Sequence, residues 1–85
     1  MIGIYGIRNI VNNKVYVGQS IHIKERWKQH EKELIRGIHN NCYLQAAWNK
    51  YGKDNFVFEI IEECSLDELN EREKYYIKFY NSVVP

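Results

Sequence analysis

The stretch that decides the fold is GIYGIRNIVNNKVYVG, which occupies residues 3–18. Two β-prone runs, at residues 4–7 and 14–17, flank the pair Asn12-Asn13. Asparagine tolerates the positive φ angle that a tight turn requires, and β-prone runs on both sides of such a pair are typical of a hairpin. The pattern therefore predicts a β-hairpin over residues 2–18.

Side-chain alternation gives this hairpin two different faces. If Asn12-Asn13 is the loop, facing residues have numbers that sum to 25, so that Ile7 lies opposite Gly18. Because side chains alternate with period two, Tyr5 and Tyr16 then share a face with Gly18. The other face is expected to be aliphatic and core-like, with Ile4, Ile10, Val15 and Val17.

Three helices and one further strand are expected after the hairpin. The first helix begins at Ser20 or His22 and ends at about Arg36, where Gly37 can cap it. A second helix spans residues 42–51, and residues 56–61 form a strand. The capping box Ser65-Leu66-Asp67-Glu68 opens a last helix that runs to about Tyr80. The expected apolar stripes are Ile23, Trp27, Leu34 and Ile38 in the first helix and Leu66, Leu69, Tyr76, Ile77 and Tyr80 in the last. This order predicts an α/β (α+β) domain whose mainly antiparallel, three-stranded sheet is flanked by three or more helices.

Composition narrows the class of protein. The 85 residues suffice for one small domain, and a hydrophobic content of 45% with 27% charged residues is typical of a globular chain. There is no apolar run long enough for a membrane span, and the start lacks the features of a signal peptide. Cys42 and Cys64 stand apart without a metal-binding spacing, which favours reduced thiols in the cytoplasm.

The formal charge of +1 averages two halves of opposite sign. Residues 1–53 contain nine Lys and Arg against three acids, a net charge of +6. Residues 54–85 contain three bases against eight acids, a net charge of −5. We therefore expect a phosphate backbone to approach the N-terminal half.

One acidic residue stands where an apolar one is expected. Glu73 lies in the middle of the last helix's apolar stripe, and a carboxylate facing a core must be paired, hydrogen-bonded or bound to a metal. Arg26 and His30 lie one turn apart on one side of the first helix. With Tyr5 and Tyr16, these residues offer a metal ligand, a guanidinium suited to phosphate, and proton-transfer groups. Such a set suits phosphodiester hydrolysis.

Several motifs resemble those of one nuclease superfamily. Gly3-Ile4-Tyr5, followed by Tyr16-Val17-Gly18, resembles the signature of the GIY-YIG nucleases, with Val17 in place of the usual Ile. Lys24-Glu25-Arg26-Trp27-x-x-His30 resembles the family's arginine helix, and Leu69-x-x-x-Glu73-x-x-x-Ile77 resembles the helix that carries its metal-binding carboxylate. The stretch Trp48-Asn49-Lys50-Tyr51-Gly52 is similar to the intron-encoded homing branch.

This resemblance implies a metal-dependent DNA endonuclease and a role for each matching residue. Glu73 would hold one Mg²⁺ or Mn²⁺, and Arg26 would contact the scissile phosphate. Tyr5 or Tyr16 would be the general base that activates water, and we favour Tyr5. His30 would hydrogen-bond a tyrosine. The substrate-binding residues would be Lys14, Gly18, Arg26 and His39, of which His39 would contact a phosphate.

The resemblance also implies how the domain is used. Residues 1–85 would form a single catalytic domain at the N-terminal end of a longer protein with a C-terminal DNA-binding region. The expected partner is double-stranded DNA, with no membrane and no organic cofactor. The domain would be a monomer in isolation, with a transient dimer possible on DNA, in the cytoplasm of a bacterium or phage-infected cell.

Two alternatives to a homing enzyme stay open. One is a structure-specific repair or recombination nuclease of the same superfamily. The other is a non-catalytic module that keeps the fold and only binds nucleic acid.

Overall fold

The computed structural model describes residues 1–81 of the chain, which contain three strands and three α-helices. Their order is β1 (Gly3–Asn9), β2 (Val15–Ser20), α1 (Ile23–Arg36), α2 (Cys42–Tyr51), β3 (Phe56–Glu63) and α3 (Leu69–Tyr80). Short 3-10 turns at Lys53–Asn55 and Leu66–Glu68 precede β3 and α3. The strands lie in the order β2-β1-β3, and both pairings are antiparallel. The predicted fold class is confirmed.

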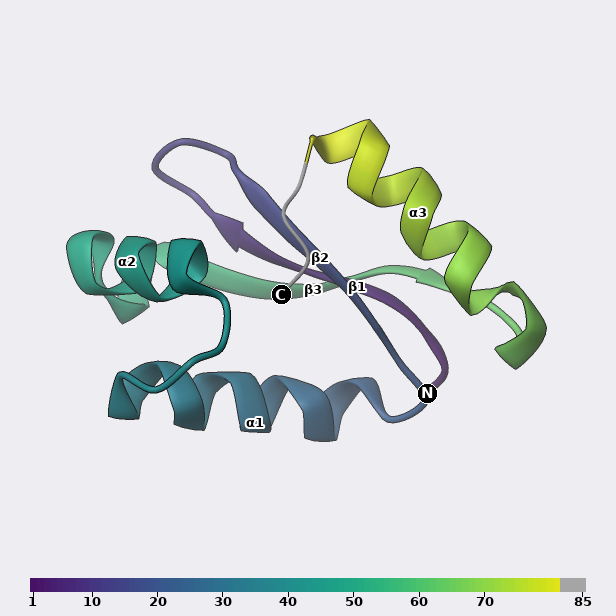
Figure 1. Ribbon diagram of the computed structural model, residues 1–85, viewed down its shortest axis with the longest axis horizontal. Coiled ribbons are helices and arrows are strands. Elements are labelled where there is room, and N and C mark those ends of the chain that lie inside the picture. The colour runs from purple at the N-terminus through teal and green to yellow at the C-terminus, as the bar shows by residue number, and fades with distance from the viewer. Residues whose placement is uncertain (82–85) are drawn as a thin grey trace.

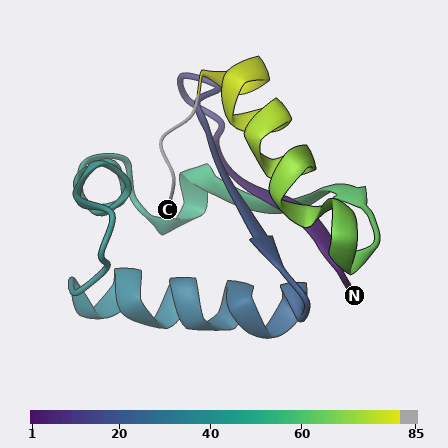
Figure 2. The same ribbon diagram turned by 45° about the vertical axis from the view of Figure 1, so that its right-hand side comes forward.

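Helices cover both faces of the sheet (Figures 1 and 2). On one face, α1 and α2 pack against the side of the strands that carries Tyr5, Ile7 and Tyr16. On the other face, α3 packs against Ile4, Val15 and neighbouring aliphatic residues. The tyrosine face is therefore as much a core as the aliphatic face, which corrects the expectation of a single core-like face. No helix within residues 1–81 is both long and apolar enough to cross a membrane.

The hairpin register differs by two residues from the prediction. Tyr5 lies opposite Gly18 and Ile7 opposite Tyr16, so facing residues have numbers that sum to 23. The amide of Asn9 donates to the Lys14 carbonyl at 2.9 Å and closes a loop over residues 10–13. A shift of two residues keeps each strand side chain on its predicted face. The tyrosines and Gly18 therefore still share one face.

Asparagine side chains account for the longer loop. The Oδ1 atom of Asn9 accepts the Val11 amide at 3.0 Å, and that of Asn12 accepts the Lys14 amide at 2.9 Å. Such side-chain hydrogen bonds take the place of backbone hydrogen bonds between the two strands. The chain therefore leaves the first strand earlier than it would with the predicted two-residue loop. Ile10, expected on the aliphatic face, lies in this loop and is 50% exposed.

The helix boundaries confirm most of the sequence signals. α1 begins after His22 rather than at Ser20, because Ser20 ends β2 and its hydroxyl accepts the His22 amide. Gly37 caps α1 with a φ of 74°, so Ile38 lies outside the helix and is exposed instead of completing the apolar stripe. The capping box is present, but Leu66 lies in the 3-10 turn before α3 and is exposed. Strand β3 runs two residues further than expected, to Glu63.

Candidate active site

Tyr5 extends across the neighbouring strand because Gly18 leaves room for its ring. The two residues face each other on β1 and β2, and a Cβ atom on Gly18 would lie 2.5 Å from both Cζ and Oη of Tyr5. Strand β2 is at the edge of the sheet, so the phenol oxygen lies over that edge strand. Gly18, the glycine of Tyr16-Val17-Gly18, therefore leaves the space that the Tyr5 ring occupies.

A buried network connects Tyr5 to two histidines. The Oη atom of Tyr5 lies 2.6 Å from Nε2 of His30, and Nδ1 of His30 lies 2.6 Å from Nε2 of His39. The backbone amide of Asn41 then donates to Nδ1 of His39 at 3.0 Å. We call this set, from Asn41 to Tyr5, the histidine network. It confirms the prediction that His30 hydrogen-bonds a tyrosine.

Local structure explains how the two histidines meet. His30 lies on α1 and is only 1% exposed. Gly37 ends α1 in the left-handed conformation, which turns the chain back so that His39 stacks against His30 with ring centroids 4.9 Å apart. Both ring nitrogens of His39 are hydrogen-bonded within the protein, and the residue is buried. This geometry does not favour the phosphate contact that the resemblance implied for His39.

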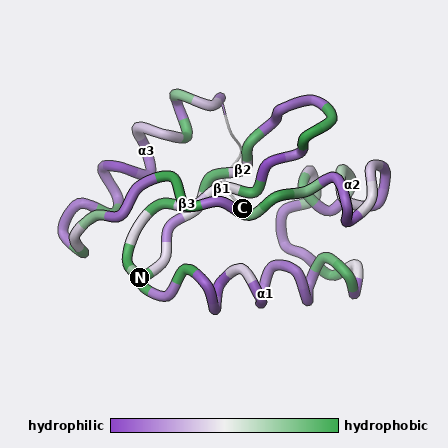
Figure 3. The backbone as a smooth tube through the Cα atoms, turned by 180° about the vertical axis from the view of Figure 1, so that it is seen from behind, coloured by the Kyte–Doolittle hydropathy of each residue, from purple (hydrophilic) through white to green (hydrophobic). Residues whose placement is uncertain are grey.

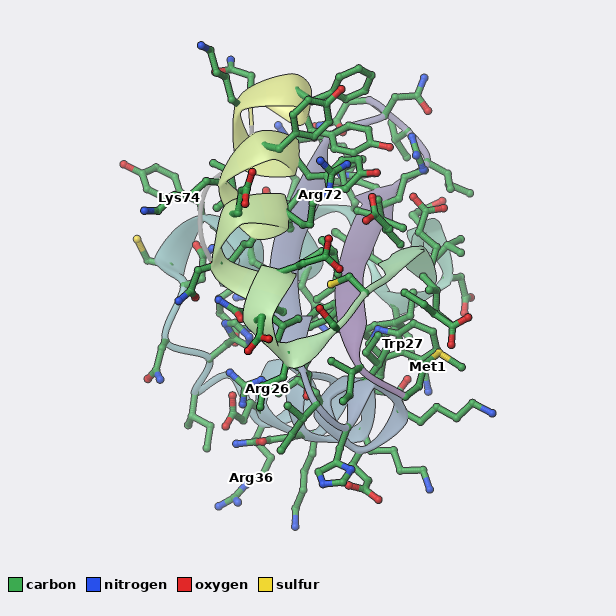
Figure 4. All side chains as sticks on the ribbon, turned by 90° about the vertical axis from the view of Figure 1, so that its right-hand side faces the viewer. Met1, Arg26, Trp27, Arg36, Arg72 and Lys74 are labelled. Atoms are coloured by element: carbon green, nitrogen blue, oxygen red, sulfur yellow. The ribbon has the colours of Figure 1, made fainter. Side chains whose placement is uncertain are left out.

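Arg26 and Glu73 act on Tyr5 from opposite helices. The pKa of the Tyr5 phenol lies above its ordinary value, mainly because of burial; the Arg26 guanidinium opposes this rise, and the Glu73 carboxylate adds to it. Arg26 is half-buried on α1, with Nη1 donating to Gln29. Figure 4 shows Arg26 on the α1 side below α3, whereas Arg36 projects outward. Tyr5, Arg26 and Glu73 thus converge from β1, α1 and α3.

Glu73 is oriented by a residue that the sequence did not single out. Gln19 on β2 donates its side-chain amide to Oε1 of Glu73 at 3.0 Å and to Oδ1 of Asn70 at 2.8 Å. The half-buried carboxylate is therefore hydrogen-bonded, which is one of the three outcomes expected for it. Nothing in the sequence marks Gln19 except its place directly after the second triplet. The amide of Asn41 was also missed, although Asn41 is recognisable as the N-cap of α2.

The histidines are kept neutral by their surroundings. Burial lowers the pKa of His30 to about 3, and the positive charge of Arg26 and the neighbouring His39 act in the same direction. Burial also lowers the pKa of His39, an effect that Glu33 partly opposes. At neutral pH each imidazole therefore carries a single ring proton.

Tyr16 has different neighbours from Tyr5. It lies opposite Ile7, one residue pair further along the hairpin, and is 2% exposed. Burial raises its pKa, and Tyr51 adds to the rise. The Lys14 ammonium lies 5.6 Å from the centre of the Tyr16 ring, beside the hairpin loop. Lys14 is therefore near Tyr16 rather than near Gly18, from which it is separated by roughly 13 Å of strand.

Two places could hold a metal ion. Within residues 1–81, His30, Glu33 and His39 form the group of three potential ligands whose atoms lie within 4.8 Å of one another. Its two facing nitrogens are only 2.6 Å apart, closer than two ligands of one tetrahedral ion, each about 2 Å from the metal. Glu73 fits a hard cation better, because Mg²⁺ takes one or two carboxylates and completes its shell with water and phosphate oxygens.

Comparisons with known proteins agree with this geometry. The family model of the GIY-YIG catalytic domain matches residues 1–84. Intron-associated endonuclease 1 of Enterobacteria phage T4 is 44% identical over 86 residues, an alignment that covers 96% of this chain and 34% of the relative. Probable intron-encoded endonuclease 1 of Neurospora crassa is 33% identical, with 93% and 27% covered. The chain thus spans about a third of the length of these curated relatives.

Solved structures show the same fold. The catalytic domain of the homing endonuclease I-TevI superposes with a TM-score of 0.89 at 42% sequence identity, covering 95% of this chain and 89% of that one. A second structure of that catalytic domain, a single-residue mutant, gives a TM-score of 0.85 at 43% identity, with 94% and 84% covered.

Proposed function

Because the chain belongs to the GIY-YIG catalytic-domain family, we propose that it is a homing-type endonuclease domain that hydrolyses phosphodiester bonds in double-stranded DNA. The observation that carries this proposal is the convergence of Tyr5, Arg26 and Glu73 at the edge strand β2. The two intron-associated or intron-encoded relatives favour the homing branch over repair nucleases of the same superfamily.

Glu73 is the proposed ligand of one Mg²⁺ or Mn²⁺. Its carboxylate is half-buried, and the hydrogen bond from the Gln19 amide fixes its orientation. When bound, such an ion supplies positive charge that stabilises the phosphate oxygens and the leaving oxygen. The His30, Glu33 and His39 group is not proposed for this role, because its nitrogens already bond to each other.

Arg26 is the proposed contact of the scissile phosphate. A guanidinium presents several donors in a planar fork that matches two phosphate oxygens at once. Nη1 of Arg26 is hydrogen-bonded to Gln29 at 2.9 Å, which limits the rotation of the group. Arg26 is also one of five basic residues on α1, a largely hydrophilic helix (Figure 3). A phosphate backbone is therefore attracted to the side of the molecule from which Arg26 extends.

Tyr5 is the proposed general base. A phenol with a reference pKa of about 10 must be helped to ionise near neutral pH. Burial raises the pKa of Tyr5, but Arg26 opposes this rise, and His30 contacts the phenol oxygen. At Tyr16 both influences, burial and Tyr51, raise the pKa. These differences support Tyr5 in place of Tyr16.

The proposal extends to how DNA is cut. One site per domain makes a single nick, so a double-strand break needs two successive nicks or a transient dimer on DNA. The T4 relative suggests action inside a bacterial or phage-infected cell.

Plasmid nicking tests the proposal. The 85-residue chain is incubated with supercoiled plasmid and Mg²⁺ or Mn²⁺, and open-circle product is measured over time. We expect EDTA to abolish nicking and Glu73→Ala to lower its rate at least about 100-fold, since the ligand is lost. Glu71→Ala is the matched control, because Glu71 is an exposed acid on the same helix. Undiminished nicking by Glu73→Ala would disprove the metal assignment, and no nicking by the unaltered chain at high concentration would disprove the activity.

A further inference from the structure

The histidine network begins at a group that can only donate. The backbone amide of Asn41 meets Nδ1 of His39 at 3.0 Å in the interior of the protein. A nitrogen that accepts this bond carries no proton. A neutral imidazole carries its one proton on the other nitrogen, so the proton of His39 is on Nε2.

The same argument determines which nitrogen of His30 carries the proton. Nε2 of His39 lies 2.6 Å from Nδ1 of His30, so its N–H donates and Nδ1 of His30 accepts. The proton of His30 is then on Nε2, which lies 2.6 Å from Oη of Tyr5. His30 therefore donates to the phenol oxygen. The phenol's own proton has to point elsewhere, because one hydrogen bond cannot hold two protons.

We propose that the Asn41 amide sets the tautomers of both histidines, so that His30 donates to Tyr5 and the Tyr5 hydroxyl points toward the side of Arg26 and Glu73. His39 and Asn41 are then positioning residues that act through His30. This assignment replaces the phosphate contact that the family resemblance implied for His39.

The surroundings of the histidine network maintain the direction of its hydrogen bonds. The charged groups that act on its members are Arg26 and Glu33 on α1 and Glu73 on α3. The lowered pKa values of both histidines leave one proton on each ring at neutral pH. The Asn41 carbonyl already accepts the Gln45 amide at 3.0 Å, so it is engaged in the first turn of α2.

The segment that carries the amide is held in place by side chains. Oδ1 of Asn41 accepts the amides of Tyr43 and Leu44 at 3.0 and 3.2 Å, as an N-cap does. Oε1 of Gln45 accepts the His39 amide at 3.1 Å. The Asn41 N–H is therefore a fixed donor.

The chemical consequence rests on the proposed function. If Tyr5 is the base, the Nε2–H of His30 stabilises negative charge on its oxygen, since a hydrogen bond to the charged form favours that form. His30 cannot accept the phenol proton, because its Nε2 already carries one. That proton leaves to solvent on the side of the β2 edge, and the ionised oxygen then accepts a proton from the attacking water.

The tautomers can be measured directly and without DNA. The 85-residue chain is labelled with ¹⁵N at its histidines, and ring spectra report which nitrogen carries the proton at neutral pH. We expect Nε2–H for both His30 and His39. A spectrum that places the proton of His30 on Nδ1 overturns the proposal, whether or not the chain cleaves DNA.

A matched pair of variants tests the direction of the network. His39→Gln keeps a donor toward His30 and an acceptor for the Asn41 amide. His39→Glu offers only acceptors, so His30 has to place a proton on Nδ1. We expect the unaltered His30 tautomer in His39→Gln and Nδ1–H in His39→Glu, with thermal unfolding showing that both fold.

Nicking assays on the same pair test the catalytic consequence. Because general-base catalysis contributes about 100-fold or more, we expect His39→Glu to nick at least about tenfold more slowly than His39→Gln. If His30 has the same tautomer in both variants, the proposal is overturned. If the tautomers differ but the nicking rates are equal, the catalytic consequence fails while the tautomer assignment holds.

Discussion

Replacing Gly18 with alanine would test the packing that brings Tyr5 to the site. A Cβ atom on Gly18 would lie 2.5 Å from Cζ and Oη of Tyr5, whereas ordinary contact begins near 3.4 Å. Tyr5 is 1% exposed and its oxygen is held by His30 at 2.6 Å, so the ring has no open space to move into. The Tyr5 hydroxyl must shift by about 1 Å, roughly the difference between ordinary contact at 3.4 Å and the overlap at 2.5 Å.

The size of the effect follows from this shift. Moving the phenol oxygen by about 1 Å lengthens its 2.6 Å bond to His30 beyond hydrogen-bonding range. Overpacking a core typically costs about 1–3 kcal/mol, and a lost buried hydrogen bond costs about 1 kcal/mol more. We therefore expect Gly18→Ala to lower the free energy of unfolding by about 2–4 kcal/mol. A misplacement of about 1 Å also predicts about 100-fold slower nicking.

Gly6→Ala separates activity from stability. A Cβ atom on Gly6 would lie 2.9 Å from Cγ1 of Val15 and 3.1 Å from Cδ1 of Ile61, on the α3 face of the sheet. This variant overpacks the core without touching Tyr5. Denaturant unfolding and plasmid nicking are measured for both variants at a temperature where each is folded. Gly6→Ala should lose stability while keeping most of its nicking rate.

Two results would refute the packing argument. One is a Gly18→Ala variant that nicks at the unaltered rate. The other is equal loss of nicking in both glycine variants, which would mean that instability and not the position of Tyr5 limits the reaction.

Two further predictions concern the tyrosines and the buried histidine. Tyr5→Phe should lower the nicking rate about 100-fold or more while Tyr16→Phe lowers it less than about tenfold, because Arg26 acts on Tyr5; the reverse order would identify Tyr16 as the base. The free energy of unfolding should fall as pH falls from 6.5 toward 3, because the pKa of His30 is about 3 in the folded protein against an ordinary value of 6.5, so the unfolded chain binds the extra proton. Each pH unit below 6.5 costs about 1.4 kcal/mol, or about 2 kcal/mol at pH 5. Chemical denaturation at several pH values checks this. The exposed control His22→Asn should keep the pH dependence of the free energy of unfolding, whereas His30→Phe should lose the part that His30 contributes. An unaltered pH dependence in His30→Phe would contradict the assignment.

Local signals in the sequence were sufficient for the elements and for most of the candidate residues. Period-two alternation placed Tyr5, Tyr16 and Gly18 on one face, and Gly37 and the capping box at Ser65 marked helix ends. These signals work because each depends on residues only a few positions apart. Because these signals are local, they could not predict the length of the hairpin loop or its register. Side-chain hydrogen bonds from Asn9 and Asn12 set the loop, and no alternation pattern reports them.

The sequence by itself determined which residues are candidates for the chemistry, and the tertiary structure decided how they are connected. Tyr5 and Tyr16 are equivalent in the pattern, and only the packing of α1 and α3 brings Arg26 and Glu73 to act on one of them. Gln19 contacts Glu73 across 54 positions, and Tyr5 contacts His30 across 25. The direction of the histidine network depends on one backbone amide, a group that every residue except proline possesses and no side-chain pattern can reveal.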